Sequence, residues 1–527
     1  MSPDNLKSLL DISEEFGLQR EVDSVVVLSG FLRQLWEKEH QPQESLKETL
    51  SDFLRDEYST ADIENHIVFK MDDNKKNIIN SIQEFLRQVL LINPTIESSG
   101  SDDPQKKPKQ PSYFPIYHRF LAKMSSQRRL GQTLGILLDS ALKDKKSDSL
   151  EKIRRGVTQL GNRREAEENF VDILFMDPVK KKETGSKSQG SDDRVTTPPN
   201  KNRDYASLFI QMGEDLANLF NLDTNVLSKS RMFLYLERFV NLYALLYYLQ
   251  IIGSRIDEKG KLIPPGQQPL ILPICSNEMG NSYYRYSEEC CQIYRMQAES
   301  FWRKYILDRV SDNVRELKCS KLDAEKILNH FLEPDRIWPI FRVSDKKIKT
   351  TGKKVIEDLE KVMKEKIDLL KNSSMSPVEI FTEAFLQYNL MGQRTLARIR
   401  WIFNRQGRGA GLVSLGLNKI AHFQLKPELL ELLVIIFSSR CKGNPAQLSL
   451  RNFIHDIRRY YGIVLGPSEG LENALEKQGL PVPPRYLLED NLDNLTRMLR
   501  NLNMLKSRSD TAKYITSPFP WLKENNE

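Results

Sequence analysis

Cysteine is scarce in this sequence, which has five in 527 residues. No two cysteines have the C-x-x-C spacing of a zinc or redox motif, and the adjacent pair, Cys290 and Cys291, has a spacing that rarely forms a disulfide bond. This usage excludes a disulfide framework and a zinc module, and it is typical of a reducing compartment. We therefore expect a cytoplasmic protein.

The sequence also lacks an apolar run long enough for a membrane helix. The most apolar run, Phe239 to Ile252, is interrupted by Asn241 and Gln250 and is shorter than the roughly twenty residues that a span needs. The first residues, MSPDNLKSLLDISEEF, are acidic and amphipathic, unlike a signal peptide. We expect a buried core helix at residues 239–252 and no membrane partner.

Catalytic motifs are absent as well. There is no phosphate-binding loop of the G-x-x-x-x-G-K-[ST] type, no H-E-x-x-H, no G-x-S-x-G and no set of kinase motifs. The six histidines are widely spaced, and none has metal-ligand spacing to another. The sequence therefore favours a non-enzymatic protein without a cofactor or a metal.

Two weaker constellations keep an enzyme open as an alternative. Asp172 and Asp177 precede three lysines at 180–182, but they match a metal-dependent nuclease site poorly. Cys441 and His455 could meet in three dimensions, although a buried core cysteine is the more common role. A nuclease would then need a site assembled from residues that are distant in the sequence.

Composition sets a mild charge balance. Hydrophobic residues make up 39% and charged residues 28% of the chain, with a net charge of +7. Such a balance permits nucleic-acid binding without requiring it. The length predicts two to four domains.

Apolar residues at helical spacing run through most of the chain, and two polar stretches, Ser98 to Ser112 and Pro178 to Asp204, resemble linkers. We expect a mainly α, multi-domain protein whose carboxy-terminal module is winged-helix-like and carries a short β-hairpin. The expected parts are an amino-terminal helical domain (1–97), a linker (98–112), a helical segment (113–177), a disordered linker (178–204), a central helical domain (205–393), an Arg/Gly-rich connector (394–425) and the winged-helix-like domain (426–527).

The carboxy-terminal module is predicted from its order of elements. KPELLELLVIIFSSR indicates a helix, a second helix follows a cap at Ser449, and LEDNLDNLTRMLRNLNML indicates a third. Turn residues 507–510 then separate two short extended runs, which is typical of a hairpin. Helices closed by a hairpin favour a winged helix, and a plain helical domain with an ordered tail is the alternative.

Two basic sets are candidate phosphate contacts. The first lies in RTLARIRWIFNRQGRGAG, which has no acidic residue and whose glycines could bring backbone amides close to an anion. The second lies in the carboxy-terminal module, where Arg458 and Arg459 are also basic. Either set could instead pair with acidic protein surfaces. The candidate residues are Arg394, Arg398, Arg400, Arg405 and Arg408 of the first set and Arg497, Arg500, Lys506, Arg508 and Lys513 of the second.

The aromatic helix RMFLYLERFVNLYALLYYLQ and the closing segment NLNMLKSRSDTAKYITSPF resemble a known family. They are similar to the helical accessory subunit of phosphorothioation-dependent DNA restriction systems, the DptG family, or to a related bacterial anti-phage component. The resemblance implies a non-catalytic partner of a nucleotide-driven DNA translocase, an ATPase, and of a nuclease. It assigns no role to any single residue.

Together these observations predict a non-catalytic helical subunit of a bacterial DNA-targeting, restriction-type complex. It would bridge a motor or nuclease subunit and double-stranded DNA. The alternative from the residues alone is a pure protein–protein scaffold that does not touch DNA.

Overall fold

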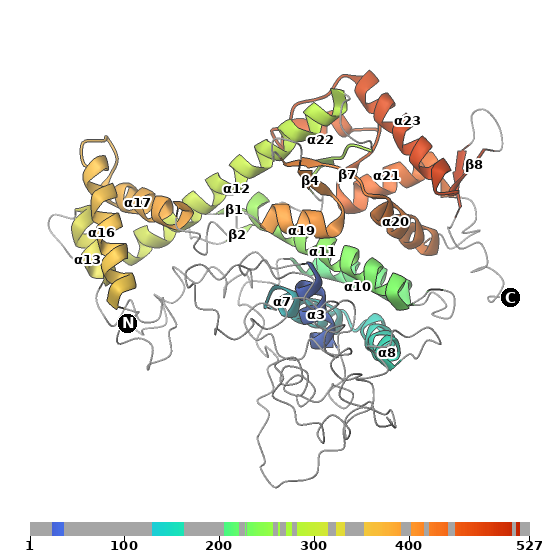
Figure 1. Ribbon diagram of the computed structural model, residues 1–527, viewed down its shortest axis with the longest axis horizontal. Coiled ribbons are helices and arrows are strands. Elements are labelled where there is room, and N and C mark those ends of the chain that lie inside the picture. The colour runs from blue at the N-terminus through green and yellow to red at the C-terminus, as the bar shows by residue number, and fades with distance from the viewer. Residues whose placement is uncertain are drawn as a thin grey trace, which may run out of the picture.

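The computed structural model describes fourteen helices and nine short strands. They and their connections lie in residues 24–35, 129–162, 205–220, 227, 229–256, 262–263, 270–276, 282–314, 323–332, 353–391, 402–415, 421–440, 448–507 and 513–516. This part of the chain is mainly helical, as the apolar periodicity predicts (Figure 1).

Two long helices organise the structure. The helix α11 (Lys229–Gly253) lies at the centre and contacts both the amino-terminal helices and the later ones. The helix α12 (Ser282–Val314) extends from the helices on the left of Figure 1 to the carboxy-terminal elements at the upper right. The most apolar run of the sequence lies inside α11 and is buried almost throughout, which confirms the expected core helix.

The remaining helices pack around these two. The amino-terminal group and the group at the end of α12 lie in different regions of Figure 1. The amino-terminal group is α3 (Ser24–Leu35), α7 (Arg129–Asp144), α8 (Ser149–Asn162) and α10 (Ala206–Phe220). The group at the end of α12 is α13 (Ala324–Leu332), α16 (Lys353–Leu370) and α17 (Pro377–Met391). The later helices are α19 (Ile402–Ala410), α20 (Pro427–Arg440), α21 (Leu450–Tyr461), α22 (Leu471–Lys477) and α23 (Arg485–Asn501).

The strands are two or three residues long and form four small sheets. β1 pairs with β2 and β4 with β5, both antiparallel, whereas β3 pairs in parallel with β7. The fourth sheet has the order β6-β9-β8 and is antiparallel throughout. The strands are β1 (Arg255–Ile256), β2 (Leu262–Ile263), β3 (Leu272–Pro273), β4 (Val413–Leu415), β5 (Ala421–Phe423), β6 (Leu448–Ser449), β7 (Ile463–Val464), β8 (Leu505–Ser507) and β9 (Lys513–Ile515).

A helix cap and a strand pairing confirm two expectations in the carboxy-terminal module. The Ser449 Oγ accepts a hydrogen bond from the Asn452 amide at 3.1 Å, so Ser449 caps α21 as its sequence predicts. The helix ends at Gly462, whose positive φ of 72° lets its N–H reach the Arg458 carbonyl oxygen. The expected hairpin is also present, because β8 and β9 pair antiparallel.

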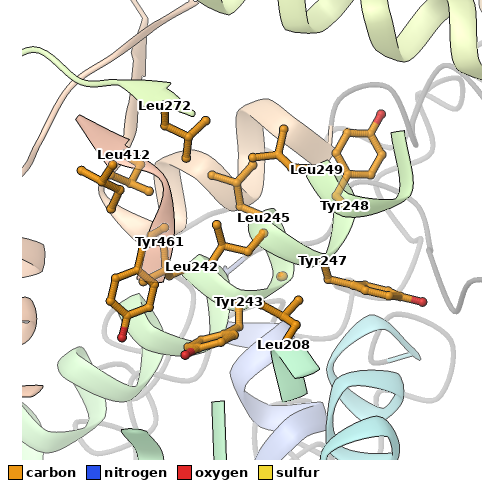
Figure 2. Packing of buried hydrophobic residues seen from close by; sticks show 14 of the residues in the cluster. Leu208, Leu242, Tyr243, Leu245, Tyr247, Tyr248, Leu249, Leu272, Leu412 and Tyr461 are labelled. Atoms are coloured by element: carbon orange, nitrogen blue, oxygen red, sulfur yellow. The ribbon is translucent and has the colours of Figure 1, made fainter. Parts of the chain in front are cut away.

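One continuous core joins the helices and most of the strands. The buried apolar residues form a single cluster that extends from Val27 in α3 to Ile515 in β9. Figure 2 shows part of this core, where Leu242, Tyr243 and Leu245 of α11 lie near Leu208 of α10 and side chains of later elements. The two expected linkers lie outside the described residues, and the expected division into domains stays a prediction.

The short strands differ from the sequence expectation. The strands β1, β2 and β3 lie within residues 205–393, which were expected to form a central helical domain. The strands β4 and β5 lie in the segment expected to be an Arg/Gly-rich connector. Two-residue and three-residue strands are too short to show a periodic pattern in sequence.

Among the described residues, no helix combines the length and the apolar character that crossing a membrane requires.

Candidate nucleic-acid interface

The carboxy-terminal end of α23 and the strand β8 carry a group of exposed basic side chains. Arg497 and Arg500 are three residues apart, which places them on one face of the helix. Leu495 and Leu499 hold the opposite face in the core at 0% exposure. The helix gives way to β8 through a turn at Asn503, so the exposed Lys506 follows directly. We call Arg497, Arg500 and Lys506 the basic end of α23.

The register of the hairpin separates two lysines of the candidate set. Lys506 lies opposite Tyr514, and Lys513 lies opposite Ser507. Directly opposed residues share one face of an antiparallel pair and adjacent residues alternate. Lys506 and Lys513 therefore belong to opposite faces of the hairpin, and Lys513 lines a groove described below.

The first half of the exposed face of α23 is acidic. Glu489, Asp490 and Asp493 are all exposed, and within the described residues only Glu489 of the three forms an ion pair, with Arg485 at 2.9 Å. The exposed face of α23 thus changes from acidic to basic along its length. A polyanion would approach the basic end and would be repelled by the acidic half.

The arginine-rich segment is only partly within the described residues. Four candidate arginines lie outside them: Arg394, Arg398, Arg400 and Arg508 of the second set. Arg408 is exposed near the end of α19, and Arg405 is half-buried and already interacts within the protein. The helix α19 packs on α11, whereas the carboxy-terminal sheet consists of β6, β9 and β8. Arg405 and Arg408 therefore lie in a different part of the fold from the second basic set.

The glycines of this segment have a packing role, and the expectation that they expose amides to an anion was wrong. Gly407 and Gly409 lie inside α19. A Cβ on Gly407 would come within 2.4 Å of Val413, and one on Gly409 within 2.7 Å of the Ser24 Cβ. Gly411 has a φ of 83° and donates its N–H to the Arg408 carbonyl oxygen at 3.0 Å. Because Gly407 and Gly409 have no side chain, α19 can lie close to its neighbours.

An arginine that sequence reasoning missed fixes the end of α19. Arg238 of α11 donates through Nη1 to the carbonyl oxygen of Gly409 at 2.7 Å and to that of Arg408 at 3.4 Å. A cation at a helix carboxy terminus satisfies free carbonyl groups and complements the helix dipole. Basic residues here therefore stabilise packing within the chain.

A fully buried carboxyl group of α10 is structural. Asp215 of α10 is completely buried and accepts hydrogen bonds from the hydroxyl groups of Tyr243 at 2.7 Å and Tyr461. Arg440 of α20 donates to its other oxygen through Nε at 2.8 Å and through Nη2. Burial raises the pKa of Asp215, and the charge of Arg440 opposes this. These four side chains join α10, α11, α20 and α21. Because the carboxylate of Asp215 is 0% exposed, a substrate has no access to it.

A second ion pair joins α11 to α20 nearer the surface. Arg231 donates through Nη2 to Glu431 Oε2 at 2.7 Å, and the Tyr235 hydroxyl donates to the same oxygen at 2.9 Å. The Nε of Arg231 also donates to the Tyr235 hydroxyl oxygen at 2.9 Å. The guanidinium of Arg231 is thus already paired with the carboxylate of Glu431 within the chain.

A groove of about 860 Å³ lies in the carboxy-terminal module, and no residue pattern predicted it. Its walls come from the start of α21, from β9, from the segment before α22 and from the first half of α23. Elements so distant in the sequence show no common signal. The lining residues are Ser449, Leu450, Arg451, Asn452, Ile454, His455, Pro467, Ser468, Glu469, Leu471, Glu472, Pro483, Arg485, Leu488, Leu492, Lys513 and Tyr514.

Metal ligands are not gathered anywhere in the part of the chain that the structure describes, where no three His, Cys, Asp or Glu residues form a group that could hold an ion. His455 is exposed on α21, and Cys441, Asp172 and Asp177 lie outside the described residues. Comparison of the chain with protein-family models, with curated proteins and with solved structures finds no match.

Proposed function

We propose that this protein is a non-catalytic helical subunit of a DNA-targeting assembly, of the bacterial restriction type that the resemblance implies. In this proposal its carboxy-terminal module is a winged helix that contacts the phosphate backbone of duplex DNA. Motor and nuclease activities belong to partner subunits, one of them an ATPase.

The winged-helix interpretation is supported by the order of elements. A helix, α20, is followed by the short strand β6 and by α21, and α23 and the hairpin of β8 and β9 come after an insertion of β7 and α22. The last strand, β9, lies between β6 and β8 in the sheet. In this arrangement α23 is the recognition helix and the β8–β9 hairpin is the wing.

The observation that carries the proposal is the basic end of α23. Arg497, Arg500 and Lys506 are exposed together where the recognition helix meets the wing. Each is available to a phosphate oxygen, because within the described residues none of the three forms an ion pair. Such contacts give affinity that does not depend on sequence.

The acidic half of α23 limits how the module can dock. Glu489, Asp490 and Asp493 occupy the first half of the helix, whose counterpart in helix-turn-helix proteins reaches the base edges. Carboxylates there oppose insertion into the major groove between two phosphate backbones. The proposal is therefore backbone contact by the basic end and not reading of bases.

The test is a salt titration of duplex DNA binding by the purified full chain. Replacing Arg497 and Arg500 by Glu should weaken binding by at least tenfold and reduce the slope of log K against log salt by about 2, because each lost phosphate contact lowers it by about 0.9. A matched control replaces Lys304 of α12 and Lys361 of α16, exposed lysines in other helices, by Glu. Equal affinity and slope for the wild type and the Arg497/Arg500 variant would overturn the proposal.

A second candidate function is a protein–protein scaffold without DNA contact, and the acidic half of α23 favours it. The same face would then bind a partner with a complementary basic surface. It predicts no duplex binding at physiological salt, together with loss of partner association when Asp490 and Asp493 are replaced by Lys. The salt titration separates the two functions directly.

A further inference from the structure

The groove of the carboxy-terminal module has an apolar floor. Leu450 and Ile454 of α21, Leu471 of α22 and Leu488 of α23 contribute to it and are 3–7% exposed. The partly buried Leu492 also lines the groove. A surface of this kind recognises apolar side chains of a ligand.

The apolar surface continues beyond the groove at its proline-rich edge. Val482 and Tyr486, which flank the lining residues Pro483 and Arg485, are 39% and 60% exposed. Large apolar side chains are seldom this exposed beside an apolar groove unless another molecule covers them, and tyrosine is enriched at the centres of protein interfaces. The edge therefore extends the area that a bound chain could cover.

Charges around the floor are unevenly distributed. Arg451 at the start of α21 and Lys513 of β9 lie on the side formed by β6 and β9, because Ser449 pairs with Tyr514. Glu469 and Glu472 line the side that leads into α22. Within the described residues, neither Arg451 nor Lys513 forms an ion pair. One side of the groove is thus complementary to carboxylates.

We propose that this groove binds a peptide segment of a partner protein, with apolar side chains on the leucine floor and acidic side chains beside Arg451 and Lys513. A nucleic-acid strand fits less well, because its phosphates would lie against Glu469 and Glu472 and its contacts would not use the floor. The residues of α23 that line the groove are Arg485, Leu488 and Leu492, and none of them belongs to the basic end of α23. The peptide proposal is therefore independent of the DNA contact.

The experiment is selection from a phage-displayed library of random peptides about twelve residues long on the immobilised full chain. The expected peptides combine leucine or aromatic residues with Asp or Glu, and synthetic copies should bind with micromolar affinity. An Asn452→Trp variant should abolish this binding, because residue 452 lines the groove while its backbone amide keeps the cap with Ser449. Binding that the Asn452→Trp variant retains would overturn the proposal.

A charge swap tests the chemistry of the ligand. Arg451→Glu combined with Lys513→Glu should weaken the acidic peptides by at least tenfold and should turn the selection towards peptides with Lys or Arg. The Lys361→Glu variant is the control, because Lys361 lies on α16, away from the module (Figure 1). Selection of no peptide, or of peptides whose charge does not follow the swap, would contradict it.

The outcome is separable from that of the DNA experiment. Arg497→Glu with Arg500→Glu should leave peptide binding unchanged, because neither residue lines the groove. The Asn452→Trp variant should retain the salt dependence of duplex binding. If duplex DNA competes with the peptide and the charge swap abolishes that competition, the groove binds nucleic acid and the peptide proposal fails.

Discussion

Asp215 and Arg440 form an ion pair across 225 positions of the sequence, with the Asp215 side chain completely buried and the Arg440 side chain 18% exposed. The guanidinium also lies over the Tyr460 ring, 4.1 Å from its centroid. Figure 2 shows Tyr243 and Tyr461, the two other donors to Asp215, side by side. This relationship holds α10 against α20 and α21 without any catalytic role.

Replacing Asp215 by Asn should destabilise the fold by about 3–5 kcal/mol, because Arg440 would lose its counter-charge in a buried site. Urea unfolding followed by circular dichroism measures the change. Replacing both partners, as in Asp215→Leu with Arg440→Met, should cost less than the sum of the two single changes. Additive single costs would show that the pair is not coupled.

The contact between α3 and α7 should be sensitive to a single methyl group. A Cβ on Gly131 would lie 1.9 Å from the Val27 carbonyl oxygen, which is backbone and cannot move without the whole helix. Gly131→Ala should therefore cost about 3 kcal/mol. Gly479→Ala is the control, since it meets no atom within 4 Å and costs only about 1 kcal/mol for its positive φ. Thermal unfolding of the two variants compares the costs, and equal shifts would contradict the packing explanation.

The buried thiols should be unreactive in the folded protein. Burial raises the pKa of Cys290 from 9.0 to about 12, so at pH 8 about one thiol in ten thousand is ionised. In a Cys319→Ser, Cys441→Ser background, a disulfide reagent should label Cys275, Cys290 and Cys291 only after unfolding. Labelling of the native chain at the rate of a free thiol would contradict this burial.

The same pKa shift gives a dependence of stability on pH. The Cys290 thiol ionises at lower pH in the unfolded chain than in the folded one, so the unfolded state binds fewer protons between pH 9 and about 12. The contribution of Cys290 to stability is therefore complete below pH 9 and is lost as the pH rises towards 12. Urea unfolding across this range should show a smaller loss for Cys290→Ala, and identical pH profiles would contradict the prediction.

A single substitution at the basic end of α23 gives a graded test of the DNA contact. Arg500→Gln should lower duplex affinity uniformly across sequences and reduce the salt slope by about 1, as expected for one phosphate contact. Fluorescence anisotropy with two unrelated duplexes measures both quantities. An effect on one duplex only would indicate base reading.

The elements that sequence predicted best are those with local signals. The buried helix at 239–252 follows from its apolar run, the start of α21 from the cap at Ser449, and the hairpin from its turn residues. These features depend on residues close together in the chain. The sequence also places Arg497 and Arg500 on one face of a helix, because they are one helical turn apart.

Tertiary contacts account for what sequence did not predict. Leu272 pairs with Ile463 in the parallel β3–β7 sheet, and nothing local indicates that partner. Gly407 and Gly409 suggest a loop by composition, yet they form a helix because their small size permits close packing. The groove is likewise assembled from separate elements, so its charge pattern exists only in the folded chain.

The central position of α11 has a consequence for synthesis of the protein on the ribosome. The helices α3 and α11 both pack on α19, which is translated much later than either. At ordinary elongation rates, tens of seconds separate α3 from α19. Contacts this distant in sequence also form slowly. A chain that stops before α19 would therefore lack the surface that covers this part of α3 and α11.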